Sequence, residues 1–243
     1  HMAKNIKKRS ASHIYFGVNK LTGELKHISE VPSGQKCNCI CAACLQPFEA
    51  RKGTRRRHHF AHVSNYECMY ASEVAIYKAF AEALKQSGFL TLPPVMLRFP
   101  AWHDPELLQE ARRLKIDSVA FECEPLSYPP LLRVTMQGTP LRILLDFDRY
   151  YDDDDRVELA EEAKAEDYSL LLISMPKIEQ DTEFTPDRLQ SALQDNDRTE
   201  WVFSRLEEQW KQKYYAVAVS PPEHGTGNLC PISFGKYKGK YSA

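Results

Sequence analysis

The chain has 243 residues, 43% of them hydrophobic and 27% charged, which is typical of a soluble globular protein. No apolar run reaches the roughly 20 residues that a membrane-spanning helix needs, and no secretory signal opens the sequence, so we expect no membrane partner. An odd count of seven cysteines, clustered with histidines, argues against a disulfide framework and favours a cytoplasmic location.

The formal net charge of −1 hides two segments of opposite sign. Residues 1–70 carry twelve Lys or Arg against four acids, whereas residues 146–167 carry eleven acids against three bases. Four basic side chains of the first segment are predicted to contact a phosphate backbone, namely Lys52, Arg55, Arg56 and Arg57. DNA is therefore the expected partner of the basic segment, and a protein is a candidate partner for the acidic face around residues 152–155. Solvated surface is the alternative for both segments.

The first predicted element is a hairpin over residues 13–31, and a cluster of four cysteines within eight residues follows it. The last two of these form a C-x-x-C pair, whose tight turn can aim two thiolates at one ion. Three histidines and a further cysteine follow between residues 58 and 68. A structural zinc ion needs four such ligands in a tetrahedron, and the spacing favours Cys41, Cys44, His62 and Cys68, with His59 or Cys39 as substitutes. A redox-active C-x-x-C pair is the alternative, which tightly bound zinc would exclude.

Beyond this zinc-knuckle module, assigned to residues 1–70, the pattern predicts an α/β domain over residues 71–220. Its first helix, over residues 72–87, carries the acid Glu73 on the face of its apolar stripe. Three strands, a helix opened by four aspartates and a buried strand follow at residues 116–122, 131–136, 141–147, 152–166 and 168–175. The core order is therefore α-β-β-β-α-β. The other expected elements are a strand over 95–99, an irregular or weakly helical stretch over 100–113, a helix over 186–212 and a strand over 214–220.

Several residues of the first half carry a family resemblance. They are GELKHISEV in the hairpin, the C-x-x-C pair, ARKGTRRRHHFAH at residues 50–62, the cysteine at 68 and the acid-bearing helix. In these features the chain resembles the competence protein CoiA-like family of bacterial predicted nucleases. The similarity is good over residues 15–85 and continues, weak but colinear, to residue 175. It implies a zinc module joined to a nuclease domain of the PD-(D/E)XK type, whose core order is also α-β-β-β-α-β.

The resemblance also implies acids that hold one or two Mg²⁺ or Mn²⁺ ions and activate a water for DNA cleavage. The family has Pro-Asp at the start of the second core strand, where this sequence has Pro130 and Leu131. On the third strand the family has an acid, which corresponds to Asp146 in this sequence. Two residues later the family has a lysine, where this sequence has Asp148. The candidate catalytic residues are Glu73, Asp146 and Asp148, with Asp117 or Glu122 as the first acid in place of the leucine.

Two interpretations of the nuclease-like domain follow. Either a rearranged acidic site still cleaves DNA, or the fold has lost catalysis and remains a scaffold that binds nucleic acid or a protein. We favour the second, because a leucine cannot bind a metal ion. The basic tail, residues 221–243, resembles the opening of an FGKYKGK motif of small bacterial proteins and reads as a truncated form of it.

Overall fold

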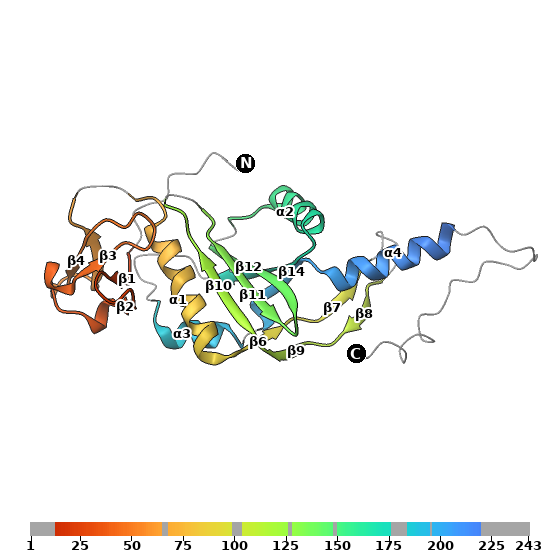
Figure 1. Ribbon diagram of the computed structural model, residues 1–243, viewed down its shortest axis with the longest axis horizontal. Helices are drawn as coiled ribbons and strands as arrows, with labels where there is room; N and C mark the ends of the chain where they lie inside the picture. The colour runs from red at the N-terminus through yellow and green to blue at the C-terminus, as the bar shows by residue number, and fades with distance from the viewer. Residues whose placement is uncertain are drawn as a thin grey trace, which may run out of the picture.

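The computed structural model describes residues 13–64, 68–98, 104–125, 128–147, 150–175, 184–194 and 196–219. A small β-rich module lies at one end of the molecule, a central sheet flanked by helices follows it, and α4 (Arg205–Val219) projects at the other end (Figure 1). Within the described ranges, no helix combines the length and the apolar character that crossing a membrane requires. The tail over residues 221–243 lies outside the described residues.

The N-terminal module consists of two small antiparallel sheets. Strands β1 (Phe16–Asn19), β2 (Leu25–His27) and β3 (Cys39–Ile40) form the first in the order β2-β1-β3, which confirms the predicted hairpin. Strands β4 (Phe48–Arg51) and β5 (His59–His62) form the second. The rings of Phe48 and Phe60 stack between them, with centroids 5.4 Å apart. These rings belong to the same apolar cluster as α1 and the central sheet, so the module and the central domain share one core.

The central sheet has five strands in the order β10-β11-β12-β13-β14. Their bounds are Ser118–Glu122, Leu131–Met136, Thr139–Phe147, Ser169–Met175 and Thr199–Phe203. Strands β12 and β13 are parallel and are joined through helix α2 (Asp153–Ala165), while the other neighbours are antiparallel. The elements over residues 71–175 thus occur in the predicted order, with four short strands inserted before β10.

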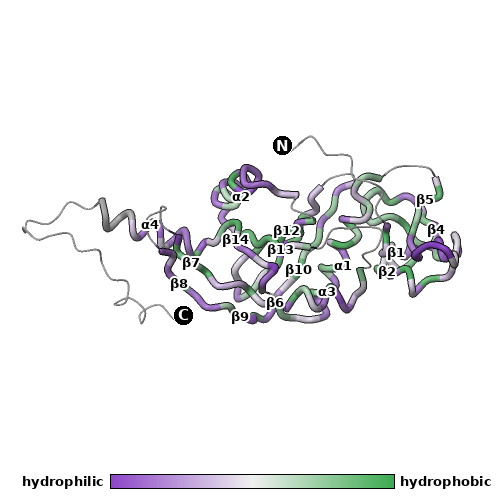
Figure 2. The backbone as a smooth tube through the Cα atoms, turned by 180° about the vertical axis from the view of Figure 1, so that it is seen from behind, coloured by the Kyte–Doolittle hydropathy of each residue, from purple (hydrophilic) through white to green (hydrophobic). Residues whose placement is uncertain are grey.

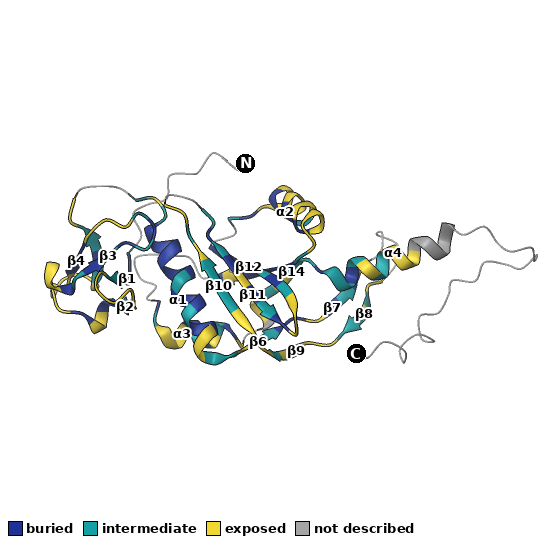
Figure 3. Ribbon diagram, viewed as in Figure 1, coloured by how far each residue is buried: buried dark blue, intermediate teal, exposed yellow. Residues whose placement is uncertain are grey.

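Helices cover both faces of the sheet, and the buried apolar residues form two clusters, one on each face. Helix α1 (Ala71–Ser87) buries Tyr77, Phe80 and Leu84 in a cluster that also contains the sheet side chains Leu132, Val134, Ile143, Leu145 and Phe147. Helix α3 (Pro186–Ala192) packs beside α1. Helix α2 covers a smaller cluster on the other face, around Leu144, Leu159 and Leu172. The tube coloured by hydropathy shows apolar β12 and β13 between these layers (Figure 2), and the outer face of α2 is exposed (Figure 3).

The ends of the two long core helices follow from local sequence. Helix α1 ends at Gly88, which takes φ 68°, a left-handed conformation that glycine adopts without steric cost. Helix α2 begins with a capping box, in which the Asp152 carboxylate accepts from the amide of Asp155 and the reverse bond also forms. Two of the four aspartates expected to make an acidic face are therefore used to start the helix, and Asp153 and Asp154 remain exposed.

Three predictions about secondary structure are wrong. The stretch 100–113, expected to be irregular or weakly helical, contains β8 (Glu106–Gln109) and the start of β9 (Arg112–Lys115), which pair with β7 (Val95–Leu97) and β6 (Phe89–Leu92). The helix expected over 186–212 is interrupted by β14, because that segment pairs with β13. The strand expected over 214–220 continues α4 as far as Val219, since so short an apolar run does not distinguish a strand from a helix.

Candidate metal centre

The C-x-x-C pair forms a tight turn between β3 and β4. The amide of Ala43 lies 3.4 Å from Cys41 Sγ, and the amide of Leu45 donates to the Cys41 carbonyl at 3.0 Å. Leu45 has φ 63°, so the turn closes through a left-handed residue. This conformation sends both cysteine side chains to the same side of the turn, and amide donors to a sulfur favour its thiolate form.

The other two members of the cluster come from different elements. His62 is the last residue of β5 and pairs with Phe48 of β4. Cys68 lies three residues before the start of α1, and its carbonyl accepts from the Ala71 amide at 3.4 Å. The cluster therefore connects the turn, the second hairpin and the first helix of the central domain.

The ligand atoms of Cys41, Cys44, His62 and Cys68 all lie within 4.8 Å of one another. In a regular tetrahedron with Zn–S bonds of about 2.3 Å, the ligand atoms are separated by about 3.8 Å. Cys44 Sγ is already 3.2 Å from His62 Nε2. Three sulfurs and one imidazole nitrogen form a donor set that suits zinc, with no position left for a substrate. These residues would hold the ion, whose contribution is to tie the three segments together.

The pKa shifts in the cluster favour the metal-binding form at His62 and Cys68 and oppose it at Cys41 and Cys44. A hydrogen bond from Cys41 lowers the pKa of Cys68 to about 6, and the same contact, together with burial, raises the pKa of Cys41. Burial raises the pKa of Cys44 and lowers that of His62. These shifts favour a neutral imidazole at His62 and make Cys68 the most acidic thiol of the three, and the thiols would release protons when a cation binds.

The two substitute ligands lie apart from this cluster. Cys39 Sγ points to the carbonyl of Cys37 at 3.2 Å, and burial raises the pKa of its thiol to about 12. His59 Nδ1 lies 2.8 Å from the Arg57 carbonyl, and its ring meets that of His13 edge-on. The favoured ligand set is thus the one that the structure brings together. Because Cys41 and Cys44 face His62 and Cys68, a redox pair has less support than a metal site.

The basic residues predicted to contact DNA lie in the loop between β4 and β5. Arg55, Arg56 and Arg57 are exposed, and within the described part of the chain no carboxylate pairs with any of them. Lys52 differs, because its ammonium donates to the carbonyl of Val31 and is partly buried. The loop connects β4 and β5 at the end of this hairpin that is opposite to His62. Figure 1 shows β4 at the end of the molecule away from α4.

The predicted catalytic acids have a different environment. Asp146, at the end of β12, is 2% exposed, and its Oδ1 accepts from the amides of Tyr150 at 2.6 Å and Tyr151 at 3.4 Å. Its Oδ2 lies 3.7 Å from Arg156, and burial raises the pKa of the carboxyl. Glu73 is buried in the first turn of α1, where its charge acts on the thiol of Cys68.

No magnesium site is assembled among the residues that the structure describes, where the Cys/His cluster is the one group of three or more suitable ligands. Asp148 lies outside the described residues. Asp117 accepts from the amide of Gly138 at 3.0 Å, at the opposite end of β12 from Asp146, roughly 23 Å away along the strand. Glu122 is exposed at the end of β10, paired with Leu131.

Two features of the central domain escaped the sequence analysis. One is Arg156, which holds Asp146 and also pairs with Glu200 of β14. The other is the direct pairing of Arg133 with Arg142 across β11 and β12. Only the register of the strands, which the turn at residues 137–138 sets, could have placed these two arginines side by side.

Comparison of the chain with protein-family models, with curated proteins and with solved structures finds no significant match.

Proposed function

We propose that the protein binds DNA through the arginine loop of its zinc module, and that the central domain is a PD-(D/E)XK-type scaffold without metal-dependent cleavage. The observation that carries the proposal is the exposed Arg55–Arg57 segment, three consecutive cations without a carboxylate partner in the described residues. Such an arrangement costs electrostatic energy in the free protein and gains it beside a polyanion.

The metal centre supports the proposal by fixing the loop. Strand β5 begins at His59, directly after the loop, and ends at the ligand His62. A bound ion would hold the hairpin against the rest of the module and so restrict the loop in the free protein. The loop would then lose less conformational entropy when it binds DNA. We assign zinc to this structural role.

The proposed type of fold is supported by the order of the elements and of the strands. Between α1 and β13 the chain contains the three antiparallel strands β10, β11 and β12, the crossover helix α2 and the parallel strand β13, but four short strands separate α1 from β10. This agrees with the core order that the CoiA-like resemblance implies for residues 71–175. The resemblance and the strand order are independent supports, because one rests on local motifs and the other on pairing.

The loss of catalysis is supported at the positions where the acids are expected. Leu131 begins β11 in place of the first acid, and Asp146 is engaged by two backbone amides and Arg156. A carboxylate bound in this way caps the loop between β12 and α2, which is a structural role. An active site rearranged around Asp148 with Mg²⁺ or Mn²⁺ is the alternative.

Two assays on the full-length chain test the proposal. A fluorescent 20-base-pair duplex is titrated with the wild type, with the triple variant Arg55→Ala, Arg56→Ala, Arg57→Ala, and with a control that loses the same charge elsewhere, Lys85→Ala, Arg113→Ala, Lys115→Ala. We expect the loop variant alone to lose binding. Equal binding by all three proteins would refute the role of the loop.

Plasmid and single-stranded DNA are then incubated with Mg²⁺ or Mn²⁺, with Asp146→Ala in parallel. We expect no cleavage by either protein. Cutting by the wild type but not by the variant would establish a nuclease and overturn the scaffold role. Absence of both cutting and binding would exclude nucleic acid and leave a protein partner, for which the acidic start of α2 is the candidate surface.

A further inference from the structure

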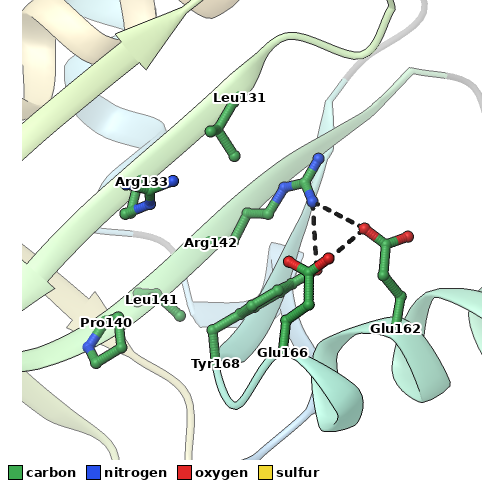
Figure 4. Close-up of a pocket in the computed structure, with 8 residues that line it drawn as sticks. All are labelled: Leu131, Arg133, Pro140, Leu141, Arg142, Glu162, Glu166 and Tyr168. Atoms are coloured by element: carbon green, nitrogen blue, oxygen red, sulfur yellow. Dashed lines mark hydrogen bonds and ion pairs between the residues drawn. The ribbon is translucent and has the colours of Figure 1, made fainter.

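A pocket of about 260 Å³ lies between the C-terminal half of α2 and the sheet, away from the metal centre and the arginine loop. Figure 4 shows the side chains that line it, which are Leu131, Arg133, Pro140, Leu141, Arg142, Glu162, Glu166 and Tyr168. The sheet contributes the arginines and the apolar residues, and the helix contributes the two acids. Its volume is small beside that of typical ligand pockets, so it suits one compact chemical group.

Two arginines lie side by side on the strands that line this pocket. Arg133 of β11 and Arg142 of β12 are directly paired in the sheet, so their side chains leave the same face. Directly opposite side chains have Cβ atoms about 5 Å apart, and like charges in that position destabilise a sheet. The next strand contributes Ala120 opposite Arg133, which adds neither a charge nor bulk. The pair therefore places two guanidinium groups side by side on the sheet, and the charge of Arg142 is offset by its ion pair with Glu162.

Arg142 is held in place by one edge of its guanidinium. Its Nη1 donates to Glu162 at 3.3 Å and to the hydroxyl of Tyr168 at 3.2 Å, as the dashed lines in Figure 4 show. Tyr168 in turn donates to Glu162 at 3.5 Å. Within the described residues the Nε of Arg142 has no hydrogen-bond partner. The side chain is thus fixed, and its Nε is a buried donor without a partner in the described part of the chain, which an anion would reach only if the surrounding side chains shift slightly.

Arg133 contrasts with its neighbour. It is exposed, and no carboxylate of the described ranges pairs with it. A ligand that bridges the two guanidinium groups would relieve their repulsion and accept from both. A tetrahedral oxyanion has acceptors in several directions, and arginine is the side chain that matches a phosphate with paired N–H donors.

We propose that Arg133 and Arg142 form a phosphate-binding site on the open face of β11 and β12. Leu131 and Pro140 also line the pocket beside the two arginines. The phosphate belongs to a nucleic-acid backbone or to a small phosphate ester, and the first source rests on the DNA binding proposed above. The site would then give the central domain a contact of its own with a strand that the arginine loop holds.

The two acids of the pocket set the strength of the site. Glu162 is neutralised by its pair with Arg142. Glu166 is the C-cap residue of α2 and is exposed, and within the described residues no cation pairs with it. Its charge opposes an anion, so the site is expected to be weak for free phosphate. Removal of the Glu166 charge should therefore strengthen phosphate binding. A general effect of the Arg133 charge on the protein surface would not predict this gain.

The test uses inorganic phosphate and a fluorescent single-stranded oligonucleotide as probes of the full-length chain. Phosphate binding is followed through the arginine Nε–Hε signals in NMR spectra, and oligonucleotide binding through anisotropy. We expect Arg133→Ala to weaken phosphate binding about tenfold, as for loss of one charge-assisted contact. Glu166→Gln should tighten it, while Arg113→Ala, an exposed strand arginine elsewhere, should leave it unchanged.

The two probes distinguish the possible failures. Weaker oligonucleotide binding by Arg133→Ala, with a salt slope reduced by about 1, assigns the phosphate to a nucleic acid. An unchanged oligonucleotide affinity together with weaker phosphate binding assigns it to a small ester. Equal phosphate binding by Arg133→Ala and the wild type, or no saturable phosphate binding, overturns the site even if the arginine loop binds DNA. Failure of the wild type to bind DNA would refute the proposed function but would leave the phosphate measurement valid.

Discussion

Replacement of Cys68 by alanine removes the ligand that connects the metal centre to α1. Three ligands would remain, and water would complete the coordination. Even residues that only support metal ligands change affinity by about 10–100-fold, so we take 100-fold as a lower bound for a ligand itself. At a fixed zinc concentration above the dissociation constant, a 100-fold loss lowers the free energy of unfolding by about 2.7 kcal/mol. For a chain of this size that corresponds to a fall in Tm of roughly 5–11 °C.

The assay measures zinc per chain by elemental analysis and Tm by thermal scanning, each with and without a chelator. The matched control is Cys123→Ala, because Cys123 is also a half-buried thiol but lies outside the cluster. We expect the chelator to destabilise the wild type and the control, and to have little effect on Cys68→Ala. One zinc per chain and an unchanged Tm in Cys68→Ala would refute the ligand assignment.

Three further predictions concern the fold around the candidate sites. Tyr77→Phe removes a buried hydroxyl that accepts from the Leu145 amide at 2.8 Å, and chemical denaturation should show a loss of about 1–3 kcal/mol, against less than about 0.5 for the exposed Tyr214→Phe. Burial raises the pKa of Asp146 above 3.8, so the folded protein binds the carboxyl proton more tightly than the unfolded chain does. The contribution of Asp146 to the free energy of unfolding therefore falls as pH rises through the raised pKa. Asp146→Asn should remove this dependence, which unfolding curves at several pH values would measure. Gly17→Ala would bring a Cβ to 3.1 Å and 3.2 Å from two buried side chains of the module, and a loss of about 1–3 kcal/mol in the same denaturation assay would be expected, whereas unchanged stability would contradict the packing.

The Cys/His cluster was predictable from sequence because the spacing of its members is a local property. Cys41 and Cys44 need only a tight turn to converge, and a single hairpin brings His62 back to them. In the structure the ligand atoms of the four cluster residues lie within 4.8 Å of one another, whereas the Cys39 thiol contacts the carbonyl of Cys37. The strand at 168–175 was predictable because its apolar run is continuous and bounded by polar residues, as for a strand buried on both faces, although the apolar run at 214–220 shows that such a segment can also be helical.

The elements that were missed depend on pairing that no local pattern reveals. Strand β9 has three charged residues and one leucine and is only half buried, so its stability comes from pairing with β6. Strand β14 is assigned by its pairing with β13, although polar residues flank it. The environment of Asp146 was equally hidden, because Arg156 reaches it from a helix ten residues later. Such contacts follow from tertiary structure rather than from propensity.

The most direct test of DNA binding through the arginine loop is the salt dependence of duplex affinity, measured in parallel for the wild type and the triple loop variant. Each phosphate contact contributes about 0.9 to the slope of log K against log salt, so loss of three contacts should reduce the slope by about 2.7. We predict that reduction for the Arg55, Arg56 and Arg57 variant and none of comparable size for the control at Lys85, Arg113 and Lys115. Equal slopes for the wild type and the loop variant would contradict the central claim.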